Sequence, residues 1–345
     1  MVIFILVVGI SFLILIHEFG HFLAARRFGL LVEEFGIGFP PRLFSKKIGE
    51  TVWSINALPF GGFVKIHGEK QEEPGSEASG DTVDPRRSFS HLSVGRRALI
   101  IAAGVVMNFF LGWLLISGVY AVGTPEKILI QDVSPGAPAE IAGFKAGDTI
   151  DNFSSMNEFI AYVNASKGKE IQVTVERDTK TLILTAIPRL TVPEGEGALG
   201  ISLTELGVPP LSIPASLVEG FKASVNILWV ILSSLGTLFL GFFKGRAPAE
   251  NFVGPVGIFQ IANASARFGL AHLFQLIGLI SLNLTVINIL PIPALDGGRL
   301  FFLLIEKIKG SPIGARREGV ANMVGFMLLI LLMVVITVHD LVRIF

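Results

Sequence analysis

The chain has 345 residues, of which 51% are hydrophobic and only 16% are charged. A soluble domain is about 25% charged, so this composition argues against an ordinary cytosolic enzyme, and its apolar character excludes global disorder. The 28 basic and 28 acidic side chains balance, which offers no basic face to nucleic acid, and the absence of cysteine excludes disulfides, thiolate metal sites and a cysteine nucleophile.

The first apolar stretch runs from Met1 to Ile16, meets His17 and Glu18, and continues to Ala25. About 20 apolar residues cross a bilayer as a helix, so residues 1–30 are predicted to form a first transmembrane helix. No basic region precedes the stretch, and it leads into ionisable residues rather than a small-residue cleavage site. Neither feature is typical of a signal peptide.

Two histidines four residues apart, His17 and His21, lie in this helix with Glu18 beside the first. Residues at i and i+4 share one helix face, so both imidazoles can reach one metal ion while Glu18 acts as general base toward water. Ionisable groups at membrane depth cost roughly 2.5–3.5 kcal/mol each when unpaired. They persist there chiefly as functional sites, which favours a metallopeptidase motif over polar side chains that merely reach the membrane surface.

The next two segments differ in their pattern of polar and apolar residues. Residues 31–66 alternate in places between polar and apolar side chains and contain several glycines and prolines, which is typical of strands and turns. Residues 67–97 are polar and begin with many acidic side chains, as expected for a solvated loop. Basic pairs border both segments, at Arg26–Arg27 and Arg96–Arg97, so this part of the chain is predicted to be cytoplasmic.

A second transmembrane helix is predicted at residues 98–123, which carry no charge. Residues 124–190 then have the pattern of a small soluble α/β domain, with strands at 128–130 and 171–175 and a helix at 158–165. Because the preceding helix leaves the cytoplasm, this domain is expected to be extracytoplasmic.

Three more apolar stretches follow, at 223–243, 268–295 and 319–338. The basic residues within 299–318 predict a cytoplasmic loop, which is possible only if one stretch does not span the membrane. Residues 223–243 are the most polar of these stretches, so they are the best candidate for a helix lying in the outer interface. A fifth true span at this position is the alternative.

This topology contains four transmembrane helices in all. Residues 191–267 are then an extracytoplasmic linker that includes the interfacial helix, and the last two transmembrane helices are 268–298 and 319–345. The loop at 299–318 joins them on the cytoplasmic side.

A catalytic zinc ion has three protein ligands and one open position. Without cysteine, the third ligand beside His17 and His21 must be His, Asp or Glu, and Asp296 is the best candidate. It follows Pro291 and Pro293, which break the helix, and the predicted topology places it at the same leaflet as the two histidines. Weaker candidates are His67, His91, His272 and His339.

These motifs resemble those of the site-2 proteases, which are intramembrane zinc metalloproteases, and most closely the bacterial sigma-E-regulating branch of that family. Residues 17–21 match the H-E-x-x-H motif, and residues 288–297 match N-x-x-P-x-P-x-L-D-G, which supplies the third zinc ligand. Residues 36–39 and 58–65 resemble the membrane-associated β-hairpin region of the family. Residues 135–148 resemble the start of a PDZ domain.

The resemblance implies a polytopic α-helical membrane protein with four transmembrane helices. It also implies a membrane-associated β-hairpin region at 31–66 and one inserted extracytoplasmic PDZ-like α/β domain at 124–190. The chain departs from the family in three ways. Val105 stands where relatives often have proline, Pro40 stands where a third glycine is common, and only one PDZ-like domain is found. The third departure bears on how substrates would be filtered by size.

The implied function is an intramembrane zinc endopeptidase that cuts single-pass transmembrane proteins, such as pre-cut anti-sigma factors or remnant signal peptides. One Zn²⁺ would be held by His17, His21 and Asp296, with Glu18 catalytic. We expect a monomer in the bacterial inner membrane, with its active site toward the cytoplasmic leaflet and with no nucleic-acid partner. The PDZ-like domain would gate substrates by size, or else only stabilise the fold.

Six further residues are substrate-binding candidates. Gly36 and Gly38 would let an unwound substrate approach the strands and add to them. By resemblance, Asn283 and Asn288 would contact the substrate backbone, with interhelical hydrogen bonding as an equal alternative. Pro291 and Pro293 belong to the same group, although shaping of the loop is the better explanation for them.

Two other functions are alternatives to a protease. A proton or ion transporter would distribute ionisable groups through the membrane depth, whereas the predicted ligands share one leaflet. A catalytically inactive PDZ membrane scaffold would have no need for three intact ligands and Glu18.

Overall fold

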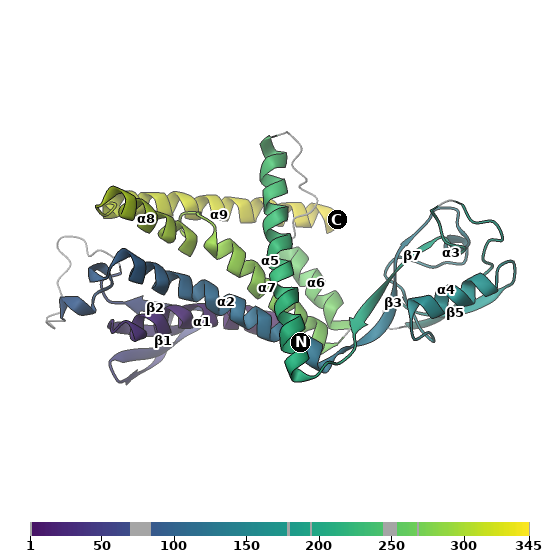
Figure 1. Ribbon diagram of the computed structural model, residues 1–345, viewed down its shortest axis with the longest axis horizontal. Helices are drawn as coiled ribbons and strands as arrows, with labels where there is room; N and C mark the ends of the chain where they lie inside the picture. The colour runs from purple at the N-terminus through teal and green to yellow at the C-terminus, as the bar shows by residue number, and fades with distance from the viewer. Residues whose placement is uncertain are drawn as a thin grey trace. The chain divides into compact units, whose positions relative to one another are not determined.

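The computed structural model describes residues 2–69, 84–177, 180–193, 195–243, 254–267 and 269–344. The chain divides into two compact units, which can be followed in Figure 1. One unit combines Met1–Gly118 with Leu217–Phe345, and the other is the inserted segment Val119–Ser216.

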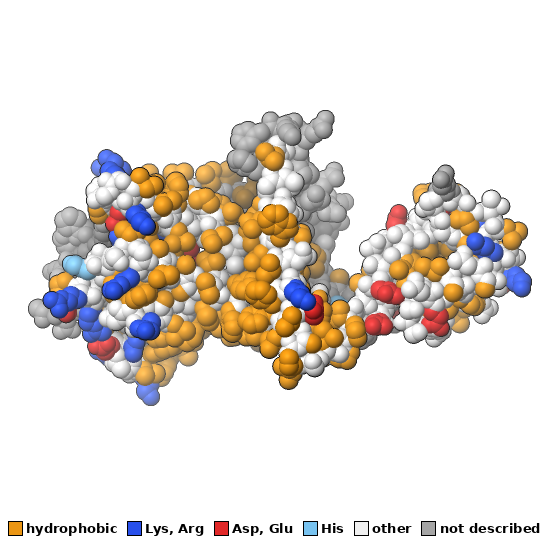
Figure 2. All heavy atoms as spheres, viewed as in Figure 1, with side chains coloured by type: hydrophobic (Ala, Val, Ile, Leu, Met, Phe, Trp, Pro, Cys, Tyr) orange, Lys and Arg blue, Asp and Glu red, His pale blue; other side chains and the backbone are white. Residues whose placement is uncertain are grey.

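The first unit consists mainly of long apolar helices. Much of their apolar surface is exposed, and Figure 2 shows hydrophobic side chains covering the helical part of the visible face. Such a surface is expected where lipid rather than water surrounds the chain, so this is a polytopic membrane protein. The helices of the described residues that are long and apolar enough to span a membrane are α1 (Val2–Arg27), α2 (Val94–Val122), α5 (Ile213–Phe243), α7 (Leu270–Ile289) and α9 (Ala315–Ile344).

Helix α5 contains residues 223–243, for which the sequence predicts an interfacial helix. It begins ten residues earlier, and by length and hydropathy it is a fifth candidate span. In Figure 1, α5 runs steeply across α2 and α9 instead of along them. It packs on α2 through Gly220, which lies directly against Ser117.

Two shorter helices complete the helical unit. Helix α6 (Pro255–Arg267) is held at its N-terminus by the buried Asp340 of α9, whose carboxylate accepts the backbone N–H groups of Gly254 at 3.2 Å and Gly257 at 2.8 Å. A carboxylate at this position stabilises the helix dipole. Helix α8 (Asp296–Lys309) occupies much of the stretch for which the sequence predicts a loop at 299–318. Leu300 and Leu303 of α8 pack into the core, whereas Phe301, Leu304 and Ile308 are exposed.

Residues 31–66 form the predicted strands. Strands β1 (Val32–Ile48) and β2 (Thr51–Ile66) pair antiparallel from Val32↔Ile66 to Ile48↔Thr51, with several register shifts between. The base of this hairpin packs against α1 through an aromatic cluster in which Phe22 contacts Phe35 and Trp53. The hairpin is therefore anchored beside the helix that carries the two histidines.

The second unit is a small α/β domain. Its sheet has the order β6-β5-β4-β3-β7, and the pairs are antiparallel. The strands and helices, in chain order, are β3 (Thr124–Val133), α3 (Pro138–Ile141), β4 (Thr149–Ile150), α4 (Met156–Ala165), β5 (Ile171–Arg177), β6 (Lys180–Ala186) and β7 (Ile201–Val208). One buried cluster, which includes Ile130, Phe159 and Val173, forms its core.

The domain extends past the predicted boundary at residue 190. Strand β7 pairs with β3 from Val133↔Ile201 to Thr124↔Val208 and so belongs to the same sheet. An irregular stretch separates β7 from β6. Because this stretch carries no strand period, the sequence pattern alone ends the domain too early.

Candidate metal centre

The two histidines of α1 and the first residue of α8 converge at one point. Asp296 Oδ2 lies 2.9 Å from His17 Nε2 and 3.3 Å from His21 Nε2, and the two Nε2 atoms are 3.2 Å apart. Both histidines are buried. The structure thus brings together the three residues that the sequence predicts as metal ligands.

Helix α1 presents both imidazoles to the same point because the residues are one turn apart. The rings lie edge to face, with centroids 4.8 Å apart. His21 Nδ1 is 2.9 Å from the carbonyl oxygen of Ile100 on α2. Because a carbonyl can only accept a hydrogen bond, Nδ1 of His21 carries the proton and its Nε2 lone pair faces the cluster.

The loop between α7 and α8 brings Asp296 to the histidines. Helix α7 ends at Ile289, and Pro291 and Pro293 prevent the helix from continuing. Ala294 has a left-handed backbone, with φ of 77°, and its N–H donates to Asn322 Oδ1 of α9 at 3.0 Å. The loop is therefore held by contacts from α9, and shaping this loop accounts for both prolines.

The donor set fits a zinc ion. Two imidazole nitrogens and one carboxylate oxygen are the ligand types of catalytic zinc sites. Apart from the two Nε2 atoms, buried Asp296 Oδ2 has no hydrogen-bond partner among the described residues. Gly104 of α2 faces the rings, and a Cβ there would lie 2.5 Å from His21 Nε2 and 2.8 Å from His17 Cε1. Only glycine at this position leaves the space between the donors open.

Glu18 lies beside this cluster and is held by the hairpin. Its Oε2 accepts the backbone N–H of Val64 on β2 at 3.1 Å. Glu18 is not one of the three donors that converge, so its carboxylate is available for proton transfer next to them.

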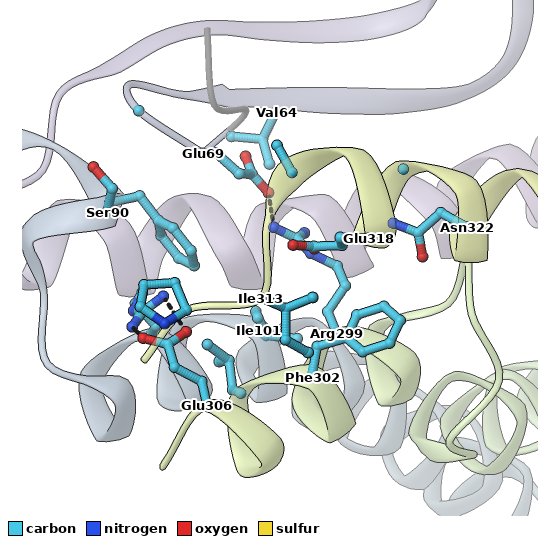
Figure 3. A pocket seen from close by; sticks show the side chains of 17 residues that line it. Val64, Glu69, Ser90, Ile101, Arg299, Phe302, Glu306, Ile313, Glu318 and Asn322 are labelled. Carbon is cyan, nitrogen blue, oxygen red and sulfur yellow. Dashed lines mark hydrogen bonds and ion pairs between the residues drawn. The ribbon is translucent and has the colours of Figure 1, made fainter. Parts of the chain in front are cut away.

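A cavity of about 500 Å³ lies beside the site, between α2, α8, α9 and the end of the hairpin (Figure 3). Val64 lines the cavity and also donates its backbone N–H to the Glu18 carboxylate, so the cavity lies next to Glu18. Arg299, also in its wall, binds Glu69 at 2.6 Å. Burial alone would lower the pKa of Arg299, but the charges of Glu69 and Asp296 outweigh it and raise that pKa above its usual value.

The remaining predicted site residues are not in the cluster. Asn283 is exposed and Asn288 half-buried on α7, and neither side chain has a hydrogen-bond partner among the described residues. Interhelical hydrogen bonding, the alternative role for these amides, is therefore not seen in this part of the chain. The space next to Gly36 is filled by the ring of Phe63, and Gly38 has φ of 76°. The hairpin itself thus already requires both glycines.

One face of α2 also contributes to the site, through residues for which the sequence alone predicts no role. Ile100, Gly104 and Asn108 are spaced four residues apart and all face the histidines, through a carbonyl oxygen, an open space and a side-chain amide. A small and a polar residue one turn apart in an apolar span mark a close helix contact. That spacing is the signal that could have found them.

Comparison with known proteins agrees with this geometry. Residues 4–332 match the model of Peptidase family M50. The regulator of sigma-W protease RasP of Bacillus subtilis is 32% identical, over 96% of this chain and 96% of that protein. A putative zinc metalloprotease of Clostridium acetobutylicum is 35% identical, over 97% of this chain and 96% of the relative. The zinc metalloprotease RasP of Shouchella clausii is 30% identical, over 97% of each. The chain therefore belongs to peptidase family M50.

Proposed function

We propose that this protein is an intramembrane zinc endopeptidase that hydrolyses peptide bonds within single-pass transmembrane segments. The observation that carries this proposal is the convergence of Asp296 with His17 and His21 next to Glu18. The two histidines and Glu18 lie on α1, which is apolar enough to span a membrane. Membership in peptidase family M50 and the zinc metalloproteases among the relatives agree with it. Three donors within 4.8 Å of one another, rather than groups spread through the membrane, argue against a transporter.

In this mechanism His17, His21 and Asp296 would hold zinc. When bound there, the ion would supply Lewis-acid chemistry, polarising a carbonyl and lowering the pKa of water to about 7. Glu18 takes the proton of the attacking water as general base. The Val64 N–H holds the Glu18 carboxylate in position, and the adjoining cavity provides a place for water.

The substrate would be a transmembrane helix whose amides are already hydrogen-bonded, so it must unwind locally before it is cut. Asn283 and Asn288 are proposed to bind the unwound backbone, because their amides have no partner among the described residues. The name of the Bacillus subtilis relative, a regulator of sigma-W protease, supports anti-sigma factors as one substrate class. Remnant signal peptides are a second class of suitable length.

Removal of the metal tests the proposed function. The full chain, purified in detergent as a monomer, should contain one zinc per chain and cleave a synthetic transmembrane peptide. A chelator should abolish cleavage, and added zinc should restore it. The chain has no cysteine, so no thiolate could replace the three donors as metal ligands. Cleavage is measured by mass spectrometry of the products. Full activity in protein shown to be free of zinc would contradict the proposal.

We also propose a four-span topology in the bacterial inner membrane, with the metal centre toward the cytoplasmic leaflet and the Val119–Ser216 unit outside. Basic residues at the ends of α1 and α8 support this orientation. The steep course of α5 across α2 and α9 supports a helix in the outer interface.

Reporter fusions test this topology. Fusions after residue 92 and after residue 312 should report a cytoplasmic position, and a fusion after residue 165 should report an outside position. A fusion after residue 243, at the end of α5, should also report outside. A cytoplasmic signal at that last position would show that α5 spans the membrane.

The inserted unit is proposed to be a PDZ-like domain that excludes bulky substrates. Strand β7 lies at the edge of its sheet, next to β3. A cavity of about 520 Å³ lies between α4 and β7, lined by residues that include Phe159, Val163 and Leu203. An edge strand beside a helix is the arrangement to which an extended peptide can add.

Gating by this domain predicts a dependence on the extracytoplasmic part of the substrate. A peptide with a short outer tail should be cleaved faster than the same peptide fused to a folded outer domain. Deletion of residues 124–208 should remove the difference, which is measured as the ratio of initial rates. If the intact enzyme cut both substrates equally fast, the domain would have only a stabilising role.

A further inference from the structure

Asn108 on α2 faces the metal centre with a side chain that is not fully paired. Its Nδ2 lies 3.2 Å from His17 Nδ1, and its Oδ1 is buried without a hydrogen-bond partner among the described residues. Only 1% of Asn108 is exposed. Its backbone oxygen accepts the Ser281 hydroxyl of α7 at 2.8 Å, which holds this turn of α2 in place. A buried amide in contact with a proposed zinc ligand needs a physical explanation.

The two nitrogens of a neutral imidazole cannot both offer a lone pair. If His17 is to bind metal through Nε2, its proton must be on Nδ1, and Nδ1 then needs an acceptor. With Nδ2 of Asn108 facing it, Nδ1 receives a hydrogen bond and the proton belongs on Nε2. A half turn of the amide exchanges Oδ1 and Nδ2 with almost no change in shape, and it supplies the acceptor.

We infer that Asn108 is a positioning residue that selects the metal-binding tautomer of His17, with its Oδ1 accepting the Nδ1 proton when zinc is held. The inference rests on the proposed zinc site. His21 differs from His17 because the Ile100 carbonyl can only accept, so the tautomer of His21 is the same with and without metal. The amide of Asn108 makes the tautomer of His17 adjustable.

Two variants separate this role from packing between α1 and α2. Asn108→Asp retains an acceptor for Nδ1 but cannot donate, whereas Asn108→Leu has a similar size and can do neither. If the amide only packed, both would bind zinc like the wild type. If it acted by donating from Nδ2, both would bind zinc more weakly. Acceptance by Oδ1 predicts a defect in Asn108→Leu alone.

The experiment measures zinc affinity of the full chain in detergent by competition with a coloured chelator, and the visible spectrum of the Co²⁺-substituted protein. Asn108→Leu should bind zinc about 10- to 100-fold more weakly and show altered Co²⁺ bands, while Asn108→Asp should bind at least as tightly as the wild type. Melting temperatures of the metal-free proteins show whether each variant folds. If Asn108→Leu does not fold, Asn108→Ala replaces it in the same comparison.

Wild-type affinity in Asn108→Leu, or equal losses in both variants, would overturn the inference. A wild-type protein that bound no zinc would instead overturn the proposed function, so the two failures are distinguishable.

Discussion

Replacing Glu18 with glutamine should reduce cleavage at least about 100-fold, the usual contribution of a general base, and leave the zinc content unchanged. The carboxamide cannot take a proton from water, but its oxygen can still accept the Val64 N–H that holds the carboxylate. Since Glu18 is not among the converging donors, its loss should not weaken metal binding. The measurements are initial cleavage rates on a transmembrane peptide and metal content by mass spectrometry.

Glu219→Gln is the matched control, because it makes the same chemical change at an exposed ion pair with Lys222 on α5. It should cleave at the wild-type rate. Equal cleavage by Glu18→Gln and the wild type would exclude Glu18 as the base. Loss of zinc from Glu18→Gln would instead make Glu18 part of the metal site.

Replacing Gly104 with alanine should weaken zinc binding and abolish cleavage with it. The new methyl carbon would lie 2.5 Å from His21 Nε2, where a metal ligand must keep its lone pair free. Helix α2 has little room to withdraw, because Gly20 of α1 packs directly on the carbonyl of Ala103 and Ser281 binds the carbonyl of Asn108. Displacement of a metal-bound ring should cost zinc affinity at least as much as loss of its outer partner, about 10- to 100-fold.

Gly118→Ala on the same helix is the control, since a Cβ there meets nothing within 4 Å. Alanine favours a helix over glycine by about 1 kcal/mol, so neither substitution should unfold α2 by itself. Zinc affinity and cleavage rate should fall together in Gly104→Ala and stay at the wild-type level in Gly118→Ala. Normal zinc binding by Gly104→Ala would mean that the donors do not hold the metal where their atoms converge.

Much of the fold could be predicted from local patterns. The predicted transmembrane helices at residues 1–30 and 98–123 correspond to α1 and α2. The alternating pattern of residues 31–66 corresponds to the hairpin. Two elements could not be predicted in this way. The basic residues of α8 favour a loop in the sequence, and β7 is recognised as a strand of the domain only through its pairing with β3.

By itself the sequence predicted the three candidate metal donors and the candidate general base. The spacing of His17 and His21 places both rings on one face of any helix, and the prolines before Asp296 end the preceding span wherever it lies. These consequences follow from backbone geometry that is local to each segment.

Only the tertiary structure decided what surrounds those donors. The open space beside Gly104, the amide of Asn108 and the Val64 N–H that holds Glu18 come from segments far away in the chain. Their roles depend on how closely α2 and β2 approach α1, and that distance results from packing between side chains of separate elements. No local pattern specifies it.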